Sequence, residues 1–175
     1  IVGDAQRTDA YEQVRDQLRA GRQAYVVCPL VSESEELQAR AATSEAERLS
    51  AGEFKDFRVG LLHGQLSSAD KTAAMTAFKQ GETDVLVATS VVEVGIDVPN
   101  ATVMVIEDAE RYGISQLHQL RGRIGRGQYE SLCLLFGPKD SRRLRALGDH
   151  TDGFKLAEID LELRGEGEML GVRQS

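Results

Sequence analysis

The stretch DVLVATSVVEVGIDVPNATVMVI (residues 84–106) contains two short apolar runs, Asp84–Thr89 and Thr102–Ile106, separated by a loop. Neither run alternates between apolar and polar residues, so both faces of each expected strand are buried. Such strands are typical of parallel sheets that helices cover on both faces. The stretch therefore predicts an α/β fold, with the loop leaving the carboxyl end of the first strand.

The same alternation of apolar strands and amphipathic helices extends along most of the chain. Further strands are expected at Ala24–Cys28, Arg58–Leu62 and Ser131–Phe136. Helices are expected from Thr8 to Gly21, Glu35 to Ala51, Ser67 to Gly81, and from about Ser115 into residues 119–126. Ligands of such sheets bind at the carboxyl ends of the strands. His63, Gly64 and Thr89 all fall at such ends.

The pattern changes after Asp140. Residues 142–147 are typical of a helix, whereas residues 151–163 fit either a helix or a strand. Their Lys, Leu, Ala and Glu content favours a helix. We expect a helical hairpin outside the sheet domain, followed by a loop containing Gly165, Gly167 and Gly171. The expected division is a sheet domain at residues 1–138 and a hairpin with its loop at 139–175.

Composition indicates a globular chain with one well-formed core. Its 175 residues are 41% hydrophobic and 28% charged, with no apolar run of membrane-spanning length and no signal peptide. Cys28 and Cys133 each lie in an apolar run without metal-ligand spacing, which predicts reduced core thiols, no metal site and a cytoplasmic protein. Because the chain begins at Ile1 rather than Met, we expect it to be part of a longer protein.

Charge is distributed unevenly along the chain. The net charge of −7 argues against a general nucleic-acid binder. Between Arg111 and Leu147, however, the sequence contains eight basic residues and only two acidic residues. An acidic body with one basic segment predicts a localised anion site.

That basic segment contains QLRGRIGR (residues 119–126), in which glycines separate Arg121, Arg123 and Arg126. A guanidinium group is always charged and presents a fork of donors that suits phosphate oxygens. The glycines leave room for the backbone to approach a ligand closely. A solvated basic loop is the alternative interpretation of this stretch taken alone.

The loop after residue 88 offers further polar groups. Thr89 places a hydroxyl group where a phosphate could dock, Gly95 permits a tight bend, and Asp97 could accept a hydrogen bond from a ribose. Taken singly, Thr89 and Asp97 are also typical of strand-end and loop-fixing residues, and His63 of a packed histidine. The phosphate-binding loop GxxxxGK[ST] is absent from the chain.

Two of these stretches together resemble a known family. TSVVEVGIDVP (89–99) and QLRGRIGR (119–126) look like motifs V and VI of superfamily 2 helicases. QAYVVCPLVSESE (23–35), LLHGQLSSADKTAAMTAF (61–78) and DLELRGEGEMLGVRQS (160–175) extend the similarity to the RecG family, bacterial ATP-dependent helicases that remodel branched DNA. The related translocase Mfd shares LHQLRGR, but QAYVVCPLVSESE favours RecG.

The resemblance implies a second RecA-like motor domain and gives roles to particular residues. Arg123 and Arg126 would be arginine fingers that reach ATP bound on the first motor domain, which also holds most of the Mg²⁺ contacts. The residues implied to line the nucleotide or couple it to DNA are Gly95, Asp97, Gln119 and Gly122. By itself the chain is then expected not to hydrolyse ATP.

The resemblance also implies contacts with DNA. His63, Gly64 and Thr89 would follow the DNA backbone, and Arg164 and Gln174 would belong to a motif that couples domain closure to translocation. The implied partners are branched duplex DNA and the first motor and wedge domains of the same polypeptide, without a membrane. The alternatives are an Mfd-like transcription-repair translocase and a non-hydrolysing interaction module with a helicase fold.

Overall fold

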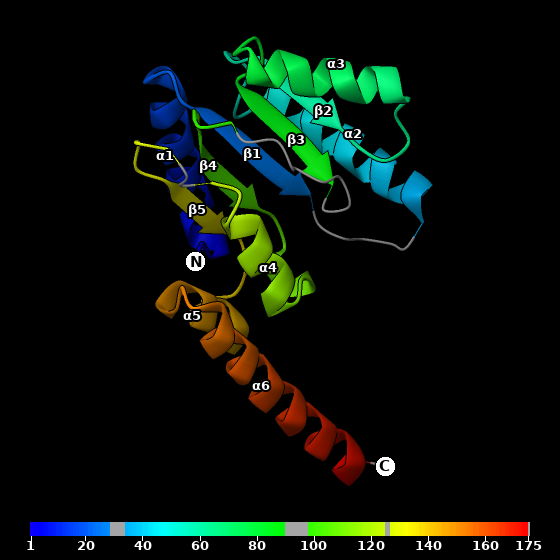
Figure 1. Ribbon diagram of the computed structural model, residues 1–175, viewed down its shortest axis with the longest axis vertical. Coiled ribbons are helices and arrows are strands. Elements are labelled where there is room, and N and C mark those ends of the chain that lie inside the picture. Colours follow the sequence, from blue (N-terminus) through cyan, green and yellow to red (C-terminus); the bar gives the residue numbers. More distant parts are fainter. Residues whose placement is uncertain (29–33, 90–97, 125–126, 175) are drawn as a thin grey trace.

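The computed structural model describes residues 1–28, 34–89, 98–124 and 127–174, with only the backbone described for 167–174. Its centre is a five-stranded parallel sheet in the order β2-β3-β1-β4-β5 (Figure 1). The strands are β1 Gln23–Cys28, β2 Val59–Leu62, β3 Val85–Thr89, β4 Ala101–Ile106 and β5 Leu132–Leu135. The predicted α/β fold is confirmed.

Helices connect β1 to β2, β2 to β3 and β4 to β5, and others precede β1 or follow β5. In the described part of the chain they are α1 Arg7–Arg19, α2 Glu35–Ala51, α3 Ser68–Lys79, α4 Ile114–Arg121, α5 Arg142–Asp149 and α6 Gly153–Gln174, with the 3-10 turns η1 Asp4–Gln6 and η2 Ala109–Arg111. Side-chain caps set several starting points: the Ser67 hydroxyl, for example, accepts a hydrogen bond from the Asp70 amide at 3.1 Å.

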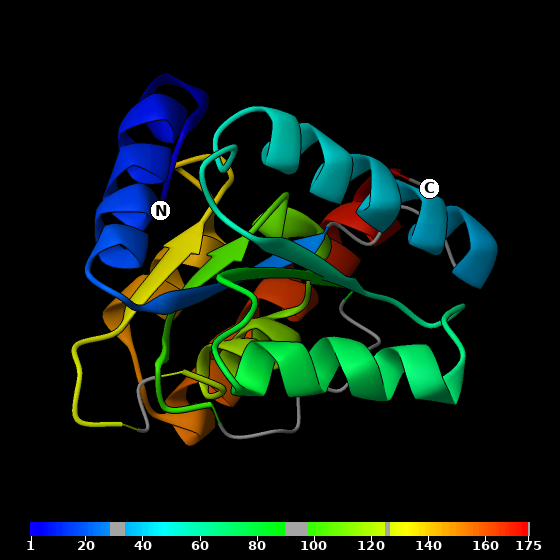
Figure 2. The same cartoon turned by 90° about the horizontal axis from the view of Figure 1, so that it is seen from above.

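The position of β1 at the centre of the sheet explains why apolar and polar residues do not alternate in the strand sequences. Val26 pairs with Val87 of β3 on one side and with Val105 of β4 on the other. Every residue of β1, β3 and β4 is buried, because helices cover both faces of the sheet (Figure 2). Both faces of these strands therefore have to be apolar.

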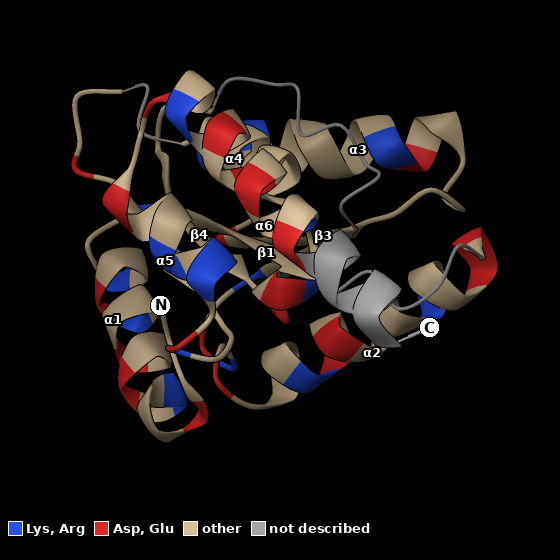
Figure 3. Ribbon diagram, turned by 90° about the horizontal axis from the view of Figure 1, so that it is seen from below, with Lys and Arg blue, Asp and Glu red and all other residues tan. Residues whose placement is uncertain are grey.

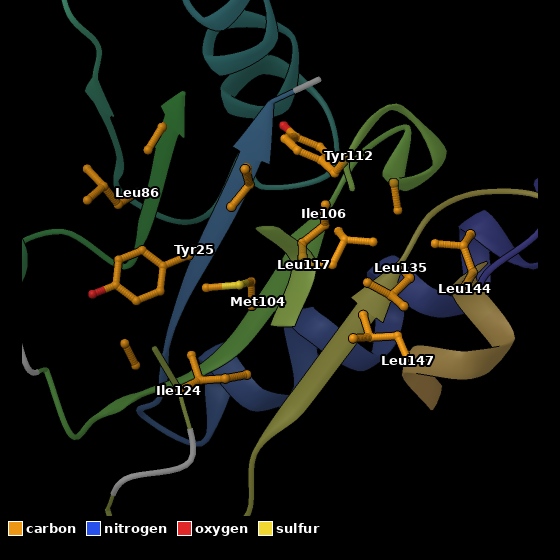
Figure 4. Packing of buried hydrophobic residues seen from close by; sticks show 14 of the residues in the cluster. Tyr25, Leu86, Met104, Ile106, Tyr112, Leu117, Ile124, Leu135, Leu144 and Leu147 are labelled. Atoms are coloured by element: carbon orange, nitrogen blue, oxygen red, sulfur yellow. The ribbon is translucent and has the colours of Figure 1, made fainter. Parts of the chain in front are cut away.

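Two apolar cores lie on opposite faces of the sheet. The first packs α1 and α2 on the sheet, with Val14 and Leu49 fully buried. The second packs α3, α4, α5 and the start of α6 on the other face, and Figure 4 shows its residues Tyr25, Met104 and Leu117. Burying each large apolar side chain contributes roughly 1.5–3 kcal/mol, so both cores are needed to hold the sheet.

The carboxyl-terminal helices form the predicted hairpin, but α6 is longer than expected. Leu144 and Leu147 of α5 and Leu156 of α6 are buried in the second core. The prediction of a loop from Gly165 onward is wrong, because α6 continues to Gln174 and extends away from the sheet (Figure 1). Each interior glycine costs a helix only about 1 kcal/mol, and the Glu, Leu and Arg residues between them favour the helix.

The two cysteines do not form a disulfide. Cys28 is buried at the end of β1, and burial raises the pKa of the half-buried Cys133 thiol to about 11. Both therefore remain neutral core thiols at physiological pH, as predicted.

Within the described residues, no helix combines the length and apolar character needed to cross a membrane.

An ionisable cluster around the buried side chains of Tyr11 and Glu107 joins α1, α2 and the residue that follows β4. The Tyr11 hydroxyl donates to Glu107 Oε1 at 3.2 Å, and Arg48 lies 3.7 Å from the same oxygen while also pairing with Glu45. Burial, together with the hydrogen bond and charge repulsion of Glu45, raises the pKa of Glu107 to about 8. The folded protein therefore binds a proton at Glu107 that the unfolded chain releases near 4.5.

This cluster predicts that stability falls as pH rises. A raised pKa in the folded state contributes stability that is complete below about pH 4.5 and is lost as pH rises through about 8. We expect the free energy of unfolding to fall by roughly 2 kcal/mol between pH 6 and 9. Glu107→Gln should flatten this slope, measured by urea denaturation, whereas Glu47→Gln on the exposed face of α2 should not. An unchanged slope in Glu107→Gln would contradict the assignment.

Candidate functional site

The stretch QLRGRIGR (residues 119–126), here named the arginine segment, begins in the last turn of α4. Ile114 and Leu117 anchor this helix in the second core, and the helical turn continues as the Arg123 amide donates to the Leu120 carbonyl at 3.0 Å. Ile124 then returns to the core at 8% exposure (Figure 4). Arg123, between these anchors, is exposed and forms no ion pair with the described residues. It is available to an anion presented from outside the chain.

Arg121 is placed differently, although it belongs to the same cluster. Its Nη1 donates to the Leu147 carbonyl at the end of α5, and its Nη2 lies 2.9 Å from Nδ1 of His118. The side chain is only partly exposed. Arg121 therefore connects α4 to the hairpin and does not point outward as Arg123 does. The i,i+3 spacing of His118 and Arg121 was the sequence signal for this contact.

Gln119 and Gly122 lie beside Arg123. Gln119 is exposed on α4, and Gly122 ends that helix, with its amide donating to the His118 carbonyl at 3.0 Å. The structure therefore brings together Gln119, Gly122 and Arg123 of the predicted nucleotide site. Arg126, Gly95 and Asp97 lie outside the described residues.

The predicted DNA-contacting residues lie side by side at the carboxyl edge of the sheet. Leu62 pairs with Ala88, so His63 and Thr89 are neighbours at the ends of β2 and β3. Both side chains are buried, at 9% exposure for His63 and 2% for Thr89. Gly64 is partly exposed, and the space where its Cβ would lie is open. At this edge, the backbone around Gly64 is more accessible than the two side chains.

His63 is held in the neutral form. Its Nδ1 accepts a hydrogen bond from the Gln65 amide at 3.1 Å. Burial and the charge of Lys71 lower the pKa of His63 below its ordinary value of 6.5. The Thr89 hydroxyl has no hydrogen-bond partner among the described residues. A neutral histidine and a buried hydroxyl do not supply positive charge for phosphate binding.

The predicted coupling residues lie on α6. Arg164 is exposed and pairs with Asp160 at 3.1 Å on the same helix, and Gln174 is the last residue of α6. Arg142 of α5 pairs with Glu166 of α6, which joins the two arms of the hairpin. Among the charged side chains of residues 153–166 of α6, acidic residues outnumber basic ones by four to two (Figure 3). Surface ion pairs of this kind contribute about 0–1 kcal/mol each.

The hairpin and the arginine helix are in contact. A Cβ added to Gly153, the first residue of α6, would lie 3.3 Å from His118 Nε2 of α4. Leu163 of α6 packs against the same core as Leu117 of α4. The structure therefore brings the arginine segment and the hairpin together around α4. No group of three or more potential metal ligands occurs in the described residues.

Comparison with known proteins extends this description. The model of the helicase conserved C-terminal domain matches residues 8–128. ATP-dependent DNA helicase RecG of Synechocystis sp. is 50% identical over all of this chain, RecG of Mycobacterium tuberculosis is 52% identical over 95% and RecG of Aquifex aeolicus is 51% identical over 98%. The chain spans only 22% to 24% of the length of these relatives.

Solved structures agree with the sequence comparison. A structure of RecG bound to a three-way DNA junction matches 96% of this chain with a TM-score of 0.77 and 45% identity, and the match covers 22% of the RecG chain. The Pyrococcus furiosus Hef helicase domain matches 81% of this chain and 28% of its own, with a TM-score of 0.54 and 25% identity. The RecA-like fold and the resemblance to RecG are thus confirmed, and the chain belongs to the family of helicase conserved C-terminal domains.

Proposed function

We propose that this chain is the second motor domain of an ATP-dependent DNA helicase that remodels branched DNA. The observation that carries the proposal is the exposed Arg123 after α4, in a chain that lacks the loop GxxxxGK[ST]. The RecG relatives are named ATP-dependent DNA helicases, and the similar RecG structure is bound to a three-way DNA junction. We extend that activity to this chain.

In this proposal the ATP site is divided between two domains. An arginine supplied in trans stabilises charge on the transferred phosphoryl group and increases the rate by about 10³–10⁵, but it does not hold the nucleotide or Mg²⁺. The first motor domain of the same polypeptide would hold both. The residues of this chain that would face the nucleotide are Gly95, Asp97, Gln119, Gly122, Arg123 and Arg126.

DNA would be contacted at the carboxyl edge of the sheet, around Gly64. Because the His63 and Thr89 side chains are buried, we assign the contact to backbone amide groups of the loops that follow β2 and β3. Contacts of this kind bind phosphates without reading base sequence, as remodelling of branched DNA requires. The wedge domain of the same polypeptide would recognise the branch itself.

Coupling between ATP and DNA would pass through α4. This helix carries the arginine segment at its end and contacts α6, on which Arg164 and Gln174 lie. A shift of α4 when the two motor domains close would therefore move the hairpin.

We place the protein in the bacterial cytoplasm, since the named relatives are bacterial and both cysteines are neutral thiols.

Arg123→Ala in the full-length protein tests the divided site. We expect the turnover number for DNA-stimulated ATP hydrolysis to fall about 10³-fold or more, because no other described residue replaces the guanidinium. Affinity for branched DNA should stay within about twofold. Phosphate release and DNA titration measure the two quantities. Arg40→Ala, which removes an exposed arginine of α2, is the matched control. Wild-type turnover in Arg123→Ala would refute the assignment.

The same division predicts that the isolated chain is inactive. Without a phosphate-binding loop it has no means to hold ATP, so phosphate release should stay at background with or without branched DNA. The full-length protein under the same conditions is the control. Turnover by the isolated chain at the full-length rate would contradict the proposal.

Arg164→Ala in the full-length protein tests the coupling role of α6. We expect ATP hydrolysis within about twofold of wild type but loss of fork unwinding, since Arg164 lies far along α6 rather than in the arginine segment. A fluorescent fork substrate and a phosphate assay measure the two activities. Lys155→Ala on the same helix should retain both. Normal unwinding by Arg164→Ala would remove the proposed role.

A further inference from the structure

Three loops meet at the amino ends of β1, β4 and β5, at the edge of the sheet opposite His63 and Thr89. Arg22 precedes β1, Asn100 precedes β4 and Tyr129 lies shortly before β5. The Arg22 guanidinium carbon lies 3.6 Å from the centre of the Tyr129 ring, and its Nη1 donates to Asn100 Oδ1 at 2.7 Å. Arg22 therefore holds two separate loops at once.

Hydrogen bonds of Asn100 and Gln23 support the position of Arg22. Asn100 Nδ2 donates to the Gly21 carbonyl at 2.8 Å, and the Asn100 carbonyl accepts from the Gln23 amide at 2.9 Å. The Gln23 side chain is buried and donates to the carbonyls of Phe78 and Thr83 at 2.6 and 2.8 Å. Gly21 has a φ of 91°, which glycine adopts without strain and which directs the chain into β1.

The two loops that Arg22 holds are those of the proposed nucleotide site. Asn100 immediately follows residues 89–99, and Tyr129 follows the arginine segment. Gly127 brings the two loops together, since a Cβ added there would lie only 3.1 Å from the Pro99 carbonyl oxygen. On the other side, Ile124 is buried in the second core. Attachments are thus found at Ile124 and at Gly127, and Arg22 with Tyr129 supports the second of them.

We propose that Arg22 and Tyr129 are positioning residues for ATP hydrolysis, which hold Gly127 beside Pro99 and so keep Arg123 in place to meet the phosphates. The proposal rests on the function proposed above. Tyr129 is 42% exposed, so the core does not need its ring. A cation–π contact at an exposed site contributes little to stability. A small displacement of a group that stabilises the transition state nevertheless lowers kcat, while the affinity for the substrate stays nearly unchanged.

The test uses steady-state ATP hydrolysis by the full-length protein on branched DNA. Tyr129→Ala and Arg22→Ala should each lower kcat at least about fivefold, with KM for ATP and DNA affinity within about twofold. Tyr129→Phe keeps the ring and should restore kcat to within about twofold of wild type. The double variant should be no slower than the slower single variant, because both changes remove one contact. Arg19→Ala, an exposed arginine of α1 paired with Glu12 and Asp16, is the control.

The outcomes separate this proposal from the one on which it rests. Inactive wild-type protein, or an active Arg123→Ala variant, would refute the divided ATP site and with it the positioning role. If Arg123→Ala is inactive while Tyr129→Ala and Arg22→Ala turn over at the wild-type rate, only the positioning role is wrong. The positioning role would also be overturned if the losses of kcat multiply in the double variant, or if Tyr129→Phe loses as much kcat as Tyr129→Ala. Thermal denaturation of each variant distinguishes lost positioning from lost folding.

Discussion

Parallel pairing of all five strands is the constraint on which the rest of this structure depends. Strands that run in the same direction cannot be joined by tight turns, so each connection has to cross the sheet through a helix or a long segment. The helices that result cover both faces, and this is why β1, β3 and β4 contain no exposed residue. The same rule sends the loops that follow β2 and β3 to one edge of the sheet, where His63 and Thr89 become neighbours although they are distant in sequence.

Sequence predicted the elements well because their signals are local. The bounds of α2 were predicted to the residue, and each predicted strand occurs within one or two residues of its place. The carboxyl-terminal end of α6 was not predicted, because glycines at 165, 167 and 171 are typical of a loop. In the structure these glycines lie within the helix. The cost of a glycine is about 1 kcal/mol, which is too small to decide the state of a segment whose other residues favour a helix.

The site residues are harder to place from sequence, because their surroundings depend on contacts between distant parts of the chain. Arg123 was assigned from its motif as an arginine finger, and its observed exposure follows from the anchors Leu117 and Ile124 on either side. Arg121 has the same residue type and the same glycine neighbours, yet it bonds to the Leu147 carbonyl. Nothing within the arginine cluster distinguishes the two, because the difference comes from a helix more than twenty residues later in the chain. The contact of Arg22 with Tyr129 is invisible in the sequence for the same reason.

The position of Arg22 also has a consequence for folding. Arg22 and Asn100 are 78 residues apart in sequence, and their hydrogen bond requires β1 and β4 to be already paired. Contacts between such distant residues form late, because closing the intervening chain costs entropy before the contact contributes stability. Tyr129 is more distant still, and its ring stacks on the same guanidinium that bonds to Asn100. On the function proposed above, Arg123 would thus be presented to a nucleotide only when the whole sheet is complete, and a partly folded chain would not act on ATP.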